Sequence, residues 1–318
     1  MTPALAGVVC AAMALPHLLR LERSPPATAA TVWLAALVLR AFTAVFASLY
    51  VVVALPATDL FTAVTHWCWH TILPVAATHL GLDGHSFGDL ARVLPGLLLG
   101  ASLLSVCFGL WRAARMVARL IQRAAVGEGP RNSVILGDRE VLVAAAGLRH
   151  PQVLISAGAL TSFDDEELEA SLEHEQGHIA RNHRYVLVVA ELCRALGRFL
   201  PGTRTAAREL GIHLERDADR FALARRHCPT ALASAICKAA RLPSAAPTTA
   251  LGGGGVNRRI RELLEADGHP AASRGLPVGI LATTMTVLVV ALATVLPSIT
   301  LAAVDGAGST AGVWHCDS

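Results

Sequence analysis

Four long apolar segments constrain the fold of this chain more than any other feature. They cover residues 4–19, 29–56, 93–111 and 275–304, and only the second contains a charged residue, Arg40. A helix needs about 20 apolar residues to cross a bilayer, and an uncharged run of about 18 or more is a strong candidate. The first segment lacks a basic leader and a cleavage site of small residues, which a signal peptide would carry. We therefore expect four transmembrane helices.

Arg40 is the exception within these segments. A charge near the middle of a bilayer costs at least about 2.5 kcal/mol unless it is paired or reaches the interface. Either Arg40 has a partner inside the helix bundle, or the second span begins near residue 41 and Arg40 lies at the membrane surface. The sequence does not decide between these two alternatives.

The arginines predict how the spans are oriented. Arg20 and Arg23 lie between the first two spans, whereas residues 57–91 contain no lysine or arginine. Four more arginines follow the third span at helical spacing: Arg112, Arg115, Arg119 and Arg123. Because basic loops remain on the cytoplasmic side, we expect residues 112–274 in the cytosol, with both termini and the tail 305–318 outside. The arginine face of the helix after the third span lies either against anionic headgroups or in solvent. The net charge of +3 is too small to indicate direct nucleic-acid binding.

The expected organisation is a membrane domain in residues 1–111, a cytosolic block in 112–274, and a fourth span. β-branched runs between turn residues predict strands at 133–136, 140–143 and 152–155. Helical patterns begin at Ser162 and cover 168–190, 204–227 and 257–266, whereas 242–255 predict an irregular loop. The predicted fold class is mainly α, of the α+β type, with a small sheet.

The pattern that carries chemistry is His174-Glu175-Gln176-Gly177-His178. On a helix, residues four apart share a face, so both imidazoles can bind one metal ion. Glu175 would lie beside that face, where it can accept a proton from an attacking water without binding the metal. Catalytic zinc has three protein ligands and one open position, so this pattern requires a third ligand from elsewhere in the chain.

Two nearby options for the third ligand fail. The extended motif of one large metalloprotease group places a glycine three residues after the second histidine and a histidine six residues after it. This chain has Arg181 and Arg184 at those positions. His183 lies about half a turn away from the ligand face of a continuous helix, so we do not expect it to be a ligand.

Glu215 is the preferred third ligand. Glu215 and Asp219 are four residues apart on a second predicted helix, so Asp219 can accept the free ring N–H of a ligand histidine while Glu215 binds the metal. The alternative is that Glu215 is a surface carboxylate paired with Arg216 or another arginine. We therefore predict one zinc ion held by His174, His178 and Glu215.

The same residues resemble a known group of enzymes. Gln152–His183 and Glu215–Ala222 are similar to the gluzincin membrane peptidases, which include BlaR/MecR-type antirepressor peptidases, HtpX-type proteases and CAAX prenyl proteases. Asn257–Leu264 resembles a further conserved segment of these families. Three spans before the catalytic block and one after it are nearest to the BlaR/MecR type. The resemblance implies a zincin-like domain in a bacterial plasma membrane.

The resemblance also implies a reaction. This is metal-assisted hydrolysis of a peptide bond, with Glu175 as the base that passes the proton to the leaving amine. It further implies that the strand near 152–156 is a sheet edge that pairs with the substrate. Candidates for stabilising the oxyanion are Tyr185, His213 and Arg259, and the sequence does not choose among them.

The chain departs from the antibiotic-sensing members of the group. Only residues 305–318 follow the last span, and no S-x-x-K sequence is present, so covalent binding of a β-lactam is not expected. The expected partners are the lipid bilayer and a protein substrate, with a transcriptional repressor as the leading candidate. The alternatives are a quality-control protease of the HtpX type and a non-catalytic zinc-binding sensor. The sequence does not decide between a monomer and a homo-oligomer.

Two features on the expected outer side stay open. His66 and His70 have the spacing of a metal pair, although such residues more often line an aromatic belt at the membrane interface. Cys68 and Cys316 lie on the same side in this topology, where a disulfide between them could form.

Overall fold

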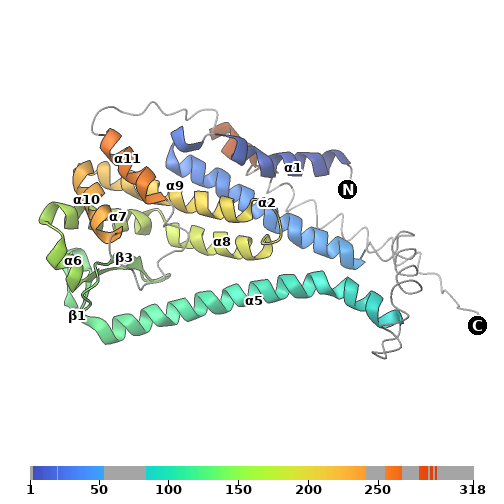
Figure 1. The fold of residues 1–318 in the computed structure, drawn as a ribbon, viewed down its shortest axis with the longest axis horizontal. Helices are drawn as coiled ribbons and strands as arrows, with labels where there is room; N and C mark the ends of the chain where they lie inside the picture. Colours follow the sequence, from blue (N-terminus) through green and yellow to red (C-terminus); the bar gives the residue numbers. More distant parts are fainter. Residues whose placement is uncertain are drawn as a thin grey trace, which may run out of the picture.

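The computed structural model describes residues 3–19, 21–53, 84–240, 255–266, 279–285, 287–288 and 291 (Figure 1). Within them the fold is mainly helical with one small mixed sheet, as predicted. The helices before the sheet are α1 (Pro3–Leu18), α2 (Pro26–Val53) and α5 (Gly84–Ala124), with the short 3-10 helix η1 (Leu21–Arg23) before α2. The helices after the sheet are α6 (Ala157–Ser162), α7 (Asp165–Ala180), α8 (His183–Leu196), α9 (Thr203–Leu223), α10 (Pro229–Ala240) and α11 (Val256–Ala266).

Two helices of the described part are long and apolar enough to cross a membrane, rather than the four expected. They are Pro26–Leu49 within α2 and Gly96–Met116 within α5, while the apolar stretch of α1 is shorter. Most of the fourth expected span, 275–304, lies outside the described residues. The helix α5 continues from its apolar part through Arg112 and Arg119 without a break, as the spacing of the arginines predicts.

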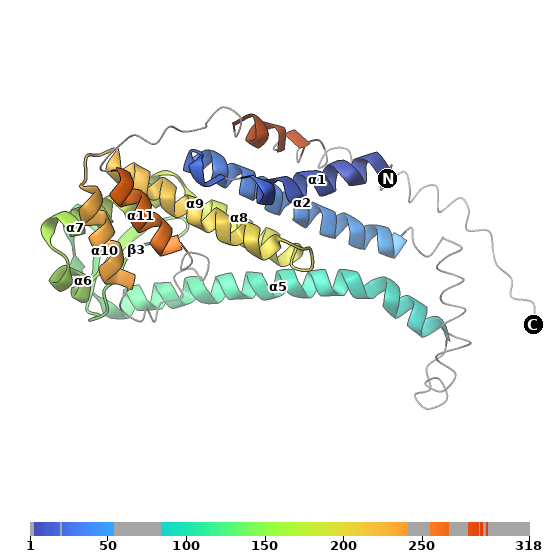
Figure 2. The same cartoon turned by 45° about the horizontal axis from the view of Figure 1, so that its top comes forward.

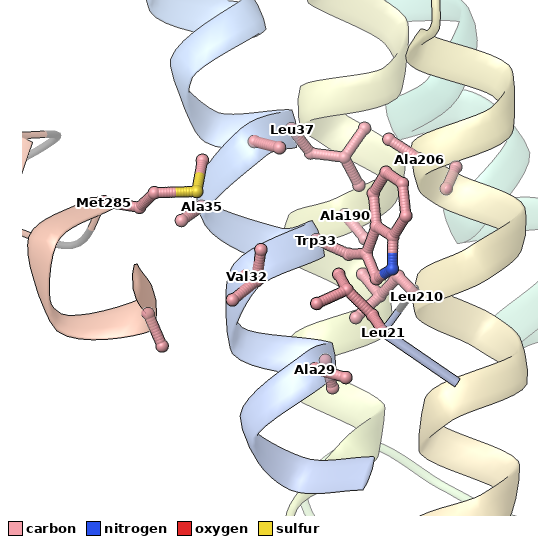
Figure 3. Packing of buried hydrophobic residues seen from close by; sticks show 14 of the residues in the cluster. Leu21, Ala29, Val32, Trp33, Ala35, Leu37, Ala190, Ala206, Leu210 and Met285 are labelled. Atoms are coloured by element: carbon pink, nitrogen blue, oxygen red, sulfur yellow. The ribbon is translucent and has the colours of Figure 1, made fainter. Parts of the chain in front are cut away.

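The helix α2 lies at the centre of the bundle. It packs against α1, α5, α8 and α9 (Figures 1 and 2). In Figure 3, Trp33 and Leu37 of α2 lie against Ala206 and Leu210 of α9, with Ala190 of α8 beside them. Alanines let the helix backbones approach closely, so α8 and α9 pack directly along a candidate membrane helix.

The structure places Arg40 inside this bundle, the first of its two alternatives. The side chain is buried, with 2% exposed. Its guanidinium donates to the carbonyl oxygens of Ala36 at 3.0 Å, Met13 at 2.8 Å and Pro201 at 3.2 Å. It also contacts His17 Nε2 at 2.9 Å. Arg40 therefore joins α1 and α2 to the connection between α8 and α9.

The sheet has the strand order β1-β2-β4-β3. Its strands are β1 (Ala125–Glu128), β2 (Val134–Leu136), β3 (Val143–Ala146) and β4 (Gln152–Ser156), and the 3-10 helix η4 (Pro130–Asn132) connects the first two. Strand β4 pairs with β2 in parallel and with β3 in antiparallel orientation. The expectation that the strand near 152–156 is an edge is therefore wrong. Val153, Leu154 and Ile155 are all buried, which is typical of an interior strand, and the edge strands are β1 and β3.

Three helix predictions also need correction. The expected helix 168–190 is two helices, because α7 ends at Ala180 and Asn182 adopts a left-handed conformation with φ 57° before α8 begins. Asparagine tolerates this conformation better than most residues. The helix α9 ends at Leu223 rather than at residue 227. The helix α10 was not predicted, although it begins at Pro229 and proline is favourable in the first turn of a helix.

Candidate metal centre

The helix α7 is fixed at its start by a capping box. The Asp164 side chain accepts from the backbone N–H of Glu167, and the Glu167 side chain accepts from the backbone N–H of Asp164. Two further side chains hold the Glu167 carboxylate: Ser234 at 2.6 Å and Lys238 at 2.5 Å, both from α10. These contacts satisfy free backbone groups at the helix start and set the position from which His174 and His178 project.

The structure brings His174, His178 and Glu215 together. The Nε2 atoms of the two histidines are 3.2 Å apart. Glu215 Oε2 lies 3.5 Å from His174 Nε2, and Glu215 Oε1 lies 3.6 Å from His178 Nε2. One ligand atom from each of the three residues lies within 4.8 Å of the others. The arrangement thus joins the motif on α7 to a carboxylate from α9.

These separations fit a zinc site. With zinc–nitrogen distances of about 2.0–2.1 Å and tetrahedral angles, two ligand atoms are about 3.3 Å apart. The observed values of 3.2, 3.5 and 3.6 Å lie near this distance. Two imidazole nitrogens and one carboxylate oxygen are also a ligand set that catalytic zinc uses. The three side chains therefore fit zinc in both donor type and spacing.

Asp219 lies behind the first histidine. Its Oδ1 atom is 2.9 Å from His174 Nδ1, close enough for an ion pair, although the orientation of the ring is not that of a hydrogen bond. Arg259 of α11 holds the carboxylate in turn, with Nε donating to Oδ2 at 2.8 Å and a terminal nitrogen to Oδ1 at 2.7 Å. The other terminal nitrogen donates to Glu215 Oε2 at 2.7 Å. One guanidinium thus pairs with both carboxylates.

Glu175 lies between this cluster and the sheet. Its Oε2 atom accepts a hydrogen bond from the backbone N–H of Ala145 in β3 at 2.6 Å. Burial raises the pKa of Glu175 to about 6. A carboxylate with this pKa is mostly ionised at neutral pH and still accepts a proton readily, which suits a general base.

The charges of the cluster are strongly coupled. Burial alone would raise the pKa of Asp219, but Arg259 and His174 lower it to about 2. Arg259 likewise holds the pKa of Glu215 well below its usual range against the effect of burial. Burial and the charge of His174 lower the pKa of His178 to about 3. Burial lowers the pKa of His174, but contacts with Asp219 and Glu215 outweigh this effect and raise the pKa to about 10.

A cavity of about 530 Å³ opens beside the cluster. His174, Glu175, His178 and Glu215 line one part of it, together with Arg259. Most of the remaining wall is apolar and comes from β3 and from α10, including Val143, Ala144, Leu232, Ala235, Ile236 and Ala239. The cluster therefore faces a mainly apolar space bounded by a sheet edge.

This combination of motif, third carboxylate and sheet edge agrees with the family comparison. Residues 112–212 match peptidase family M48. The matched stretch resembles the zinc metallopeptidase domains of that family, and it contains His174, Glu175 and His178. Glu215 lies three residues beyond the match. No curated protein is significantly similar to the chain.

The three candidates for the oxyanion stabiliser lie in different surroundings. Arg259 lines the cavity, but its guanidinium already donates to Asp219 and Glu215. His213 is buried against Arg216 and does not line the cavity. Tyr185 is 44% exposed, with the Arg184 guanidinium over its ring, and is likewise absent from the cavity wall. Only Arg259 is close to the cluster.

Sequence reasoning missed two residues near the metal cluster. His183 contacts His178, and Asp217 contacts His183, both through ring nitrogens. Helical spacing placed His183 off the ligand face, because the left-handed turn at Asn182 was not foreseen, and it gave Asp217 no role. An asparagine directly after the motif helix was the available signal. The proposed pairs His66–His70 and Cys68–Cys316 lie outside the described residues.

Proposed function

We propose that this protein is a membrane-bound zinc metalloendopeptidase that hydrolyses peptide bonds of a cytosolic or membrane protein. The observation that carries the proposal is the convergence of His174, His178 and Glu215, with Glu175 beside them. The M48 match supports the class of reaction. Zinc, when bound by these three residues, would polarise the scissile carbonyl and lower the pKa of a water to about 7.

The residues of the chain supply the proton transfers and the binding surface. Glu175 accepts the proton of the attacking water and passes it to the leaving amine. Edge strand β3 offers backbone groups to an extended peptide, which would add as a further strand. The apolar cavity wall accepts an apolar side chain of that peptide. Arg259 keeps Glu215 and Asp219 ionised and in place.

The packing supports a site close to the bilayer surface. Arg216, next to Glu215, donates to the carbonyl oxygen of Glu22 at 2.7 Å, in the connection that precedes α2. Pro201 contacts Arg40, which lies ~21 Å along α2 from its start at 1.5 Å per residue. The hairpin of α8 and α9 therefore runs alongside the first part of a candidate span. We place the M48 domain on the cytosolic side, with both termini outside, as the arginines indicate.

The proposed substrate is supported only by the sequence motifs. Their resemblance to BlaR/MecR-type peptidases favours cleavage of a repressor protein in a signalling response. Quality control of membrane proteins is the competing role. Comparison of new protein N-termini in cells that carry the wild type or Glu175→Gln separates the two roles. One regulatory protein cut in response to a stimulus supports signalling, whereas many unrelated membrane proteins support quality control.

Glu175→Gln also tests the catalytic proposal. With purified protein in detergent and casein as an unfolded substrate, we expect a loss of cleavage rate of about 10²–10⁴-fold, because a general base contributes this much. Zinc content should stay at one ion per chain. Glu166→Gln is the matched control, since Glu166 is exposed on the same helix. Equal cleavage by Glu175→Gln and wild type would refute the role of Glu175 as the base, and no cleavage by the zinc-loaded wild type would support a non-catalytic sensor.

A further inference from the structure

The two histidines of the cluster differ in the group that contacts their second ring nitrogen. His178 directs Nε2 toward His174 and Glu215, and its Nδ1 atom lies 3.0 Å from Nδ1 of His183. The two rings are 4.9 Å apart and meet edge to face, at 80°. His183 is 3% exposed. A buried imidazole therefore stands where a carboxylate stands behind His174.

The turn between α7 and α8 creates this contact. The helix α7 ends at Ala180, and Asn182 with φ 57° turns the chain before α8 begins at His183. The turn folds the first residue of α8 back onto the last turn of α7. In an unbroken helix His183 would point about half a turn away from the ligand face.

A carboxylate completes the chain of contacts. Asp217 Oδ2 lies 3.2 Å from His183 Nε2. Asp217 is 5% exposed and also contacts Arg181 at 3.5 Å. Asp217 comes from α9, the helix that supplies Glu215 and Asp219. Both ligand histidines are thus connected to carboxylates of the same helix, one directly and one through an imidazole.

The hydrogen bonds admit one arrangement of protons when both imidazoles are neutral. The ionised Asp217 can only accept, so His183 carries its proton on Nε2. The Nδ1 atom of His183 then has a lone pair and accepts the proton carried by Nδ1 of His178. As a result Nε2 of His178 is unprotonated and directs its lone pair toward the cluster. This is the form of the ring that binds a metal.

We propose that His183 and Asp217 are positioning residues that fix the tautomer and the ring orientation of His178 for metal binding. The proposal rests on the proposed zinc site and extends it to two residues that do not contact the ion. Partners behind metal ligands typically change metal affinity by about 10–100-fold when they are removed. The expected effect is of this size and concerns binding rather than the proton transfer at Glu175.

Zinc affinity of the purified protein, measured against a chelating dye, tests the proposal. We expect His183→Leu to weaken zinc binding about 10–100-fold, and Asp217→Asn about tenfold. His183→Asn should keep most of the affinity, because its amide oxygen takes the place of the ring Nδ1 as an acceptor. His150→Leu is the control, since His150 is exposed in a loop. Should His183→Leu fail to fold, Asp217→Asn and His183→Asn still decide the question.

The melting temperature of the metal-free variants separates positioning from a purely structural role. A positioning role predicts weaker zinc binding with little change in the melting temperature of metal-free Asp217→Asn. Unchanged zinc affinity in His183→Leu and Asp217→Asn, with or without a lower melting temperature, would overturn the inference and leave the proposed function intact. A wild type that binds no zinc would overturn both.

Discussion

The helix α9 has two halves that are buried in different ways. Its first half presents Ala206, Ala207 and Leu210 to α2. Its second half presents Glu215 and Asp219 to α7. The apolar half needs only a close fit, whereas buried carboxylates need charged partners because desolvation of a charge is costly. The comparison indicates that the first half stabilises the fold, while the second half is kept for chemistry and depends on Arg259.

Loss of Arg259 should have the largest effect on this comparison. Arg259→Met leaves Glu215 and Asp219 buried without their cation, and breaking such a pair costs about 3–5 kcal/mol. We expect the metal-free protein to unfold correspondingly earlier in detergent, and zinc to restore part of the loss by neutralising the same charges. Arg261→Met on the exposed side of α11 is the control. Equal stability of the two variants without zinc would contradict the role given to Arg259.

Truncation of a side chain in the apolar half of α9 should lower stability almost as much, but the loss should not depend on zinc. Leu210 is fully buried against α2, and Leu→Ala substitutions at such sites cost about 3 kcal/mol. Zinc should stabilise Leu210→Ala by the same increment as the wild type, measured by thermal unfolding at several zinc concentrations. Leu264→Ala, at a half-exposed position of α11, is the control. A larger zinc increment in Leu210→Ala would show that the two halves are not independent.

Glu167 is a third buried carboxylate, and its contribution to stability should depend on pH. Burial tends to raise the pKa of Glu167, but hydrogen bonds from Lys238 and Ser234 outweigh this and lower the pKa below its ordinary value of 4.5. Its contribution to stability is therefore present above about pH 4.5 and is lost as the pH falls through the lowered pKa. Glu167→Gln should cost about 1–2 kcal/mol at pH 7.

The difference between Glu167→Gln and wild type should shrink as the pH falls below 4.5, measured as melting temperature between pH 3 and pH 7. Glu166→Gln, one residue away and exposed, should match the wild type throughout. A difference that grew toward low pH would mean that the pKa of Glu167 is raised rather than lowered.

The smallest effect is expected at the outer rim of the same helices. Arg258 pairs with Glu22 at 3.1 Å and with Glu209 at 3.2 Å. The Glu22 side chain is 60% exposed, so solvent and salt screen this pair. Arg258→Ala should therefore cost less than about 1 kcal/mol, and the difference should decline in high salt. A loss of stability as large as that of Arg259→Met would show that the contacts of Arg258 stabilise the site as strongly as those of Arg259.

The sequence predicted those parts of the site that depend on local spacing. Residues four apart on a helix share a face, which was enough to select His174 with His178 and Glu215 with Asp219. It did not predict contacts that depend on how helices meet. The guanidinium of Arg259 comes from α11, and its place behind both carboxylates follows from tertiary packing. Residue spacing alone could not tell whether Arg259 stabilises the oxyanion or pairs with Glu215 and Asp219.

The errors in the fold have one local cause and one long-range cause. A left-handed residue at Asn182 divides a pattern that reads as one helix. Strand β4 was assigned to the edge by resemblance, although its run of buried residues is typical of an interior strand. The pairing order of short strands depends on long-range contacts, which hydrophobic patterns do not encode. The number of spans remains a prediction, because most of 275–304 lies outside the described residues.

The adjacency of Glu215 and Arg216 on α9 has a mechanical consequence. One of these neighbours points to the metal cluster, and the other holds the Glu22 carbonyl oxygen of the segment leading into α2. A rotation of α9 about its axis cannot adjust one contact while leaving the other unchanged. A shift of α9 that moves Glu215 would therefore also move the contact that Arg216 makes with the segment leading into α2.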